Sequence, residues 1–290
     1  MLKKNLVKKG FFGYGFLLLM PNITAVKGEP LVQSHAAGLM NLQEVIRTTD
    51  SLGLEPVAAT ANEVYSETPE KKTVAPTVGL NKHATKYVQS FLKREDESLT
   101  LVKKRSKSYF KLIDTVFTKY RLPVELKYLA VIESELKTTA VSRVGAKGMW
   151  QLMPVTAREL GLKVSKKNDE RTHVYKSTVA AAKYLRDLYA EYGDWLLVIA
   201  AYNGGPGVVN KAIRKAGSRN FWALQQYLPM ESRGHVKRFI GTHYYFEGKG
   251  SITTLTKAEA IAYTKAMASY TAAIEDEKEK ESAVVASANR

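Results

Sequence analysis

Apolar residues recur at helical spacing along the chain from about Asn81 onward, and this pattern predicts a helical domain. Two early segments show it, KYVQSFLKRE and SKSYFKLIDTVFTKY, and a third runs from about Pro123 to Leu136. Glycines stand where several of the later helices are expected to end, a position that favours a left-handed residue: Gly161, Gly193, Gly204 and Gly217. No segment alternates polar and apolar residues over enough length to predict a long strand. The expected fold class is therefore all-α.

The same pattern divides the 290 residues into four parts. Residues 1–28 combine a basic start, MLKKNLVKKG, with a short apolar run, FFGYGFLLLM, which is typical of an export signal; an uncleaved anchor is the alternative. Residues 29–81 have little apolar periodicity and predict a flexible spacer with one short helix around AGLMNLQEVIRTT. Residues 82–248 form the expected domain. Residues 249–290 predict a polar tail, partly helical over TKAEAIAYTKAMASYTAAI or disordered, with a solvated charge run, EDEKEKES.

One carboxylate lies on the apolar side of the helix expected over residues 123–136. At about 100° per residue, Glu133 falls within the stripe that Leu126 and Leu129 define, whereas Glu135 falls on the solvent side. Burial raises the pKa of a carboxyl group, so that it holds a proton near neutral pH and can give it to a leaving oxygen. That is the role of a glycosidase general acid. The alternative is a structural Glu that pairs with an Arg or caps a backbone amide.

A Ser- and Gly-rich stretch, TTAVSRVGAKGMWQLMP, follows this helix directly. Its glycines allow a close approach of the backbone to a ligand. Ser142 and Gln151 offer hydrogen bonds to a sugar, and Met149 and Trp150 offer an apolar surface for a sugar ring. Taken singly, such a loop is usually a turn and such a Trp usually belongs to the core.

Other polar residues have simpler interpretations. Asp169 and Glu170 precede a predicted helix and Asp194 precedes WLLVIAAY, where Asp and Glu normally act as N-terminal caps. Tyr202 and Asn203, in AAYNGGPG, are candidates for lining a cleft, or for a rim aromatic and a helix terminator. No obvious second catalytic carboxylate is found. The sequence has no metal-ligand spacing, no phosphate-binding Gly loop and no convincing Ser-His-Asp order, so no cofactor is expected.

Three motifs in this order resemble those of the lytic transglycosylases, a family of peptidoglycan-cleaving enzymes. They are ES (Glu133 and Ser134), AVSRVGAKGMWQLMPVTA (140–157) and AYNGGPG (201–207), and the resemblance covers roughly residues 82–248. GMWQ and NFWALQQYLPMESRGHVKRF are closer to the membrane-bound D type of the family than to the soluble type.

The resemblance implies a lysozyme-like helical fold with the glycan in a groove beside the catalytic helix. It implies cleavage of the β-1,4 bond between N-acetylmuramic acid and N-acetylglucosamine, with a 1,6-anhydro ring as product and Glu133 as sole acid and base. The implied glycan contacts are Ser142, Met149, Gln151, Tyr202 and Asn203. His235 departs from the pattern, because the family usually has Tyr there; it is expected to be a surface or packing residue. The segment 249–290 is too short for the peptidoglycan-binding repeats that D-type relatives often carry.

Charge and cysteine content limit the partners. The formal charge is +16, which favours a polyanionic partner or simply solubility, and the absence of Cys excludes disulfides. The expected location is the periplasm or cell envelope, with peptidoglycan and envelope proteins as partners and membrane contact only if residues 1–28 are retained. Three alternatives stay open: a muramidase that uses Asp169 or Glu170 as second carboxylate, a non-catalytic wall-binding scaffold, and a basic nucleic-acid-binding protein. The export signal and the lack of a reading helix disfavour the last.

Overall fold

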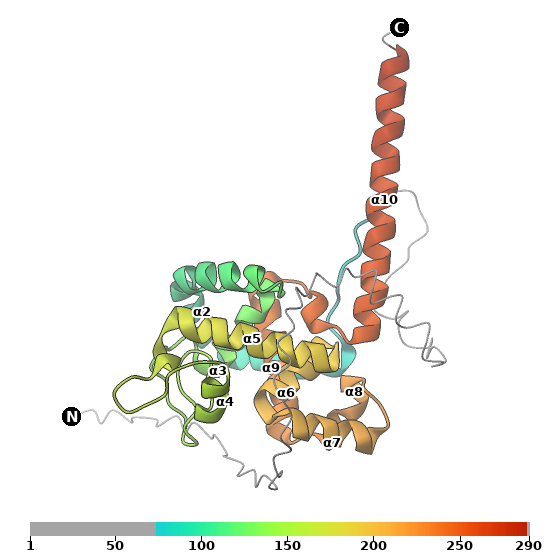
Figure 1. The fold of residues 1–290 in the computed structure, drawn as a ribbon. Helices are drawn as coiled ribbons and strands as arrows, with labels where there is room; N and C mark the ends of the chain where they lie inside the picture. The colour runs from blue at the N-terminus through green and yellow to red at the C-terminus, as the bar shows by residue number, and fades with distance from the viewer. Residues whose placement is uncertain (1–73, 289–290) are drawn as a thin grey trace, which may run out of the picture.

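The computed structural model describes residues 74–288. The expected export signal and the expected short helix in the spacer lie outside these residues. Within them the chain is helical, and its β pairing consists of isolated bridges such as Val141 with Lys147 and Lys147 with Leu152 (Figure 1). The predicted all-α class is confirmed.

The helices of the described part are joined by connections of different lengths, with long ones between α3 and α4 and between α4 and α5. Their bounds are α2 (Lys82–Lys119), α3 (Tyr128–Ser134), α4 (Pro154–Glu159), α5 (Val174–Tyr192), α6 (Trp195–Gly204), α7 (Pro206–Ala216), α8 (Phe221–Leu224), α9 (Met230–Glu247) and α10 (Lys257–Ala288), with 3-10 turns η2 (Val124–Lys127), η3 (Glu170–Thr172), η4 (Gln225–Tyr227) and η5 (Ile252–Thr254). The two apolar segments expected early in the domain form one continuous helix, α2, because no Pro or Gly separates them.

The core is built around α6, which packs against α5, α7 and α9, while α2 packs against α9 and α5. Residues 195–201 are all buried, as expected for a helix that is apolar on every side. Asp194 caps this helix by accepting hydrogen bonds from the backbone N–H groups of Leu196 and Leu197, which confirms its predicted role. It also accepts the N–H of Lys257 at 2.7 Å. One buried carboxylate therefore joins the starts of α6 and α10.

The C-terminal segment differs in part from the expectation. Residues 252–256 pack into the domain beyond the boundary expected at 248, with Thr253 and Leu255 buried. The helix that follows, α10, continues through the charge run and projects away from the domain (red in Figure 1). Among the described helices, none combines the length and the apolar character that crossing a bilayer requires.

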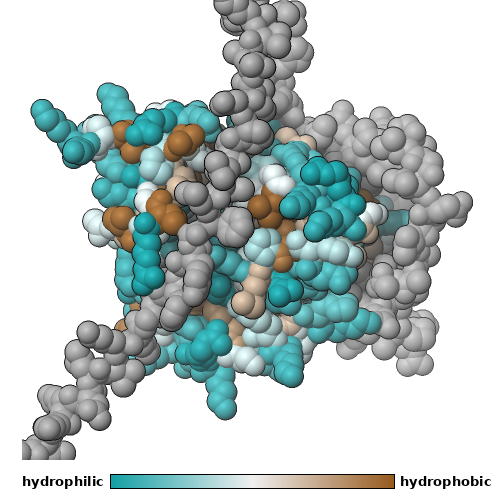
Figure 2. Space-filling view, turned by 90° about the horizontal axis from the view of Figure 1, so that it is seen from below, coloured by the Kyte–Doolittle hydropathy of each residue, from teal (hydrophilic) through white to brown (hydrophobic). Residues whose placement is uncertain are grey.

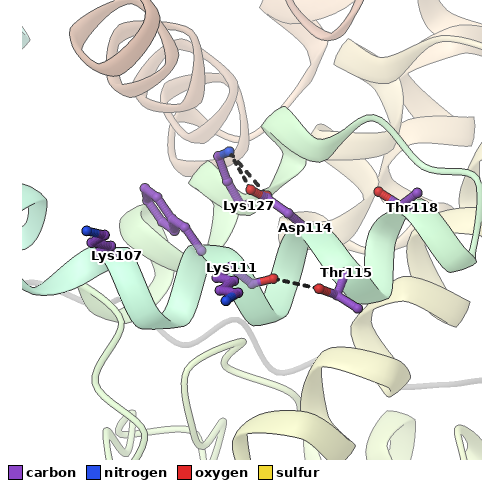
Figure 3. A pocket seen from close by; sticks show the side chains of 7 residues that line it. Lys107, Lys111, Asp114, Thr115, Thr118 and Lys127 are labelled. Atoms are coloured by element: carbon purple, nitrogen blue, oxygen red, sulfur yellow. Dashed lines mark hydrogen bonds and ion pairs between the residues drawn. The ribbon is translucent and has the colours of Figure 1, made fainter.

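The face of the domain seen in Figure 2 is mainly hydrophilic, with hydrophobic residues in small separate groups among teal ones. A shallow hollow lies along α2 (Figure 3). In it Lys127 Nζ lies 3.1 Å and 3.3 Å from the two carboxylate oxygens of Asp114. Its lining residues are Lys107, Phe110, Lys111, Asp114, Thr115, Thr118 and Lys127. None of the candidate site residues lines this hollow, which is a basic surface feature of α2 and η2.

Candidate active site

The carboxylate of Glu133 lies in the last turn of α3, a helix that ends earlier than predicted. The chain enters through the 3-10 turn η2, and α3 stops because Glu135 and Leu136 adopt left-handed conformations, with φ of 54° and 64°. The N–H of Leu136 donates to Ala130 O and closes the end of the helix. Left-handed non-glycine residues cost energy and gather at functional sites. The early end places Glu133 directly beside the Ser- and Gly-rich loop.

Glu133 is on the buried side of the helix, as the helical periodicity predicts. Leu126 and Leu129 are fully buried around it, and its own side chain is 14% exposed. Burial raises the pKa of Glu133 to about 8; the charge of Arg238 opposes this rise and that of Glu231 adds to it. The carboxyl group therefore carries a proton at neutral pH and still reaches the surface.

Glu135 faces the other way, toward α2. Its carboxylate lies 3.3 Å from the guanidinium of Arg105 and 2.9 Å from the ammonium of Lys137. Its side chain is 34% exposed. Two neighbouring glutamates thus have different surroundings, and only Glu133 is held without a matching cation in direct contact.

The loop over residues 140–152 is attached to both α3 and α6 through its backbone carbonyls. Ser134 Oγ donates to Met149 O at 2.8 Å, and the Tyr202 hydroxyl donates to Trp150 O at 2.8 Å. The catalytic candidate on α3, the loop and the end of α6 therefore form one connected unit.

Arg171 holds the far side of the same loop. It is buried, and its Nη1 donates to Gly145 O at 2.7 Å and to Leu152 O at 3.0 Å. Asp169 fixes this guanidinium through two hydrogen bonds and also lies 3.2 Å from Lys147 Nζ. The hydrogen bonds from Arg171 lower the pKa of Asp169 to about 2.

Asp169 and Glu170, the two candidates for the second carboxylate of a muramidase, are both engaged elsewhere. Asp169 caps η3 and pairs with Arg171, and Glu170 pairs with Lys176 and accepts the backbone N–H of Lys163. The predicted capping role is confirmed for Asp169, at η3, whereas Glu170 has a structural role of another kind, because α5 is capped by His173. The carboxylate whose charge does raise the pKa of Glu133 is the exposed Glu231, on α9.

Met149 and Trp150 lie in the core. Both side chains are 0% exposed, and Trp150 Nε1 donates to Thr178 Oγ1 at 3.0 Å while its ring lies against Phe117. This corrects the expectation that these two side chains present an apolar surface to a sugar ring. Both instead belong to the core, and Trp150 anchors the loop to α2 and α5.

Ser142 and Gln151 are half-buried and shape the loop. Ser142 Oγ accepts the N–H of Ala146 at 2.9 Å. Gln151 has a left-handed backbone, with φ of 46°, and its amide nitrogen donates to Ala140 O and Gly148 O. Both residues lie in the loop where the sequence places them, with side-chain groups used internally.

Tyr202 and Asn203 lie at the end of α6, between the loop and α9. Burial raises the pKa of Tyr202 well above its usual range, and the charge of Glu133 adds to the rise. Asn203 Oδ1 accepts a hydrogen bond from Ser232 Oγ at 2.9 Å. The structure thus attaches Tyr202 to the loop and Asn203 to α9.

Three residues of α9 complete the surroundings of Glu133: Glu231, His235 and Arg238. His235 is buried, and its Nε2 lies 3.3 Å from Glu133 Oε1. Of the two expected roles, a surface residue is wrong because His235 is buried, whereas a packing residue agrees with its position, and the ring also contacts the candidate catalytic group. A sequence signal was present: His235 stands four residues before the buried Phe239, on the apolar side of α9.

Part of the chain matches a known protein family. Residues 114–225 match the family described as the transglycosylase SLT domain. Glu133 and all five predicted glycan contacts lie inside this range, whereas His235 lies outside it. The resemblance that the motifs indicate is confirmed.

The matches to individual relatives cover only part of each relative's length. Membrane-bound lytic murein transglycosylase D of Escherichia coli K12 is 38% identical over 141 residues, which are 47% of this chain and 31% of that protein. A putative tributyltin chloride resistance protein of Alteromonas sp. is 38% identical over 110 residues, 38% of this chain and 53% of that protein. The 70 kDa soluble lytic transglycosylase of Escherichia coli aligns with a TM-score of 0.43 and 26% identity over 50% of this chain and 26% of that one. The chain spans about a third of the length of the first curated relatives.

Proposed function

We propose that this chain is a peptidoglycan lytic transglycosylase in which Glu133 acts first as acid and then as base. The observation that carries the proposal is the buried, protonated carboxyl of Glu133 at the edge of a loop whose sequence matches the transglycosylase SLT domain. The relatives' names, which refer to murein and to membrane binding, support the peptidoglycan wall as partner and an exported, envelope-associated location.

A single carboxyl group is enough because the substrate supplies the nucleophiles. Glu133 protonates the oxygen that links N-acetylmuramic acid to N-acetylglucosamine, while the N-acetyl group of the muramic residue assists at the anomeric carbon. The ionised Glu133 then removes the proton of the 6-hydroxyl of the same sugar, whose oxygen bonds to the anomeric carbon and closes the 1,6-anhydro ring. Water is not consumed, in contrast with two-carboxylate glycosidases.

The glycan lies beside α3 in this proposal, along the loop and the end of α6. Tyr202 and Asn203 line the cleft near the acid, and Ser142 and Gln151 contribute from the loop. Met149 is not proposed as a side-chain contact, because it is fully buried.

The products of digestion test this proposal. Purified peptidoglycan is digested with the chain from residue 29 onward, and the fragments are analysed by mass spectrometry. We expect muropeptides lighter by one water molecule than hydrolysis products. Reducing ends would instead indicate a muramidase, and binding without any products would indicate a wall-binding scaffold.

The rate should depend on pH through Glu133. Because the acid must be protonated to start the reaction, we expect kcat/KM to fall as pH rises through about 8, the pKa to which burial raises this group. Initial rates of muropeptide release across this range check the prediction, with circular dichroism at each pH to exclude unfolding. A rate that stays constant well above this pH would contradict it.

A muramidase with Glu231 as second carboxylate is the alternative that one observation favours, since Glu231 is exposed and its charge reaches Glu133. Glu231→Gln separates the two reactions. For a transglycosylase we expect anhydro products to persist and the alkaline loss of rate to move to lower pH, because a like charge that raises the pKa of Glu133 is gone. Loss of all turnover in this variant would favour the hydrolase.

A further inference from the structure

The imidazole of His235 contacts the carboxyl group of Glu133, yet the mechanism above does not use it. The distance from its Nε2 to Glu133 Oε1 is 3.3 Å. Among the described residues, this nitrogen has no hydrogen bond of normal geometry, and it is shielded from water. An unpaired N–H in such a place is costly, so the facing carboxyl oxygen is its natural acceptor.

The other ring nitrogen fixes the tautomer. Arg238 Nη2 lies 3.3 Å from His235 Nδ1, and a guanidinium has only donors, so Nδ1 must accept. Burial and the positive charge of Arg238 also hold the pKa of His235 well below its usual range. The ring is therefore neutral, and its one proton sits on Nε2, toward Glu133.

The remaining groups around the carboxyl cannot replace this donor. Glu231 is an anion, and Arg238 acts on Glu133 through its charge from the far side of the imidazole. Tyr202, from α6, already donates its hydroxyl proton to Trp150 O. His235 is thus the neutral donor aimed at Glu133 from α9.

We propose that His235, oriented by Arg238, is a positioning residue for Glu133, an inference that rests on the proposed function. Its Nε2–H engages one carboxyl oxygen, so the proton of the neutral acid is carried by the other oxygen, which is left to face the glycosidic bond. When Glu133 has given up this proton, the contact becomes a charge-assisted hydrogen bond and strengthens. The arrangement therefore stabilises the ionised state in which Glu133 acts as base.

Two substitutions separate positioning from packing. His235→Phe keeps a planar ring but removes the donor, whereas His235→Gln places an amide N–H near the position of Nε2. We expect His235→Phe to lower kcat by about tenfold or more with KM within about twofold, and to move the alkaline loss of rate to higher pH. His235→Gln should recover most of kcat and the wild-type pH profile. Equal losses in both variants, or wild-type behaviour of His235→Phe, would overturn the proposal.

A spectroscopic measurement tests the contact between His235 and Glu133 even if a His235 variant fails to fold or the chain releases no anhydro products. Two-bond ¹H–¹⁵N spectra of the wild type should show His235 neutral and protonated on Nε2, with a ¹⁵N shift that changes in Glu133→Gln. Protonation on Nδ1, or no response to Glu133→Gln, would overturn the positioning role. Absence of anhydro products together with the expected spectrum would refute the proposed function alone.

Discussion

Glu133→Gln is expected to reduce the release of anhydromuropeptides by about a thousandfold or more, the range that loss of a general acid and base produces. The amide keeps the size of the carboxyl group and fits the same space between α3 and α9, but it has no proton to give and cannot take one back. The measurement is the rate of fragment release from purified peptidoglycan, followed by mass spectrometry. Near-normal rates would rule out Glu133 as the acid.

The loss should not reflect unfolding, and the pH dependence of stability provides the check. The pKa of Glu133 rises from 4.5 to about 8 on burial, so the folded state holds a proton that the unfolded state has released between these values. The contribution of this group to stability is present below the lower value and falls as pH rises through the higher one. At neutral pH the wild type therefore bears a cost of up to about 3 kcal/mol that the Gln variant lacks. We expect the melting temperature of Glu133→Gln to equal or exceed that of the wild type at pH 7.

Glu135→Gln is the matched control, because it makes the same chemical change two residues away. Its carboxylate pairs with Arg105 and Lys137 at the surface, where an ion pair contributes about 0–1 kcal/mol. Product release should stay within about twofold of the wild type. A large loss here would contradict the different orientations of the two glutamates.

The local pattern was enough to predict the helices and the buried side of α3. Helical periodicity depends on neighbouring residues alone, so the position of Glu133 beside Leu126 and Leu129 could be calculated before any tertiary contact was known. The end of α3 could not be predicted in this way, because Glu135 and Leu136 adopt left-handed conformations although neither is a glycine.

The surroundings of Glu133 depend on contacts between distant parts of the chain. The sequence of the loop does not show whether Met149 and Trp150 face a groove or the core. The side chain of Trp150 lies in the core because it packs against Phe117 and donates a hydrogen bond to Thr178. His235 meets Glu133 only because α9 packs against α3. The contact between His235 and Glu133 therefore could not be predicted from residue type and spacing along the chain.

The attachment of the loop makes Gly148→Ala a strongly destabilising substitution. Gly148 has φ of 85°, and a Cβ built there would lie 2.0 Å from the backbone oxygen of Arg171, too close for any real contact. The backbone at Arg171 cannot easily yield, since its guanidinium is fixed by Asp169 and holds two loop carbonyls. We expect a loss of about 3 kcal/mol or more in the free energy of unfolding, measured by urea denaturation.

Gly145→Ala is the control that separates the clash from the backbone conformation. Gly145 has nearly the same φ, 88°, but nothing lies within 4 Å of its added Cβ. Strain of the left-handed backbone alone should cost about 1 kcal/mol at either position. A loss at Gly148 no larger than that at Gly145 would mean that the loop can move away from Arg171. A larger loss, together with reduced turnover at temperatures where Gly148→Ala remains folded, would show that the close contact between these two segments also holds the loop in place beside Glu133.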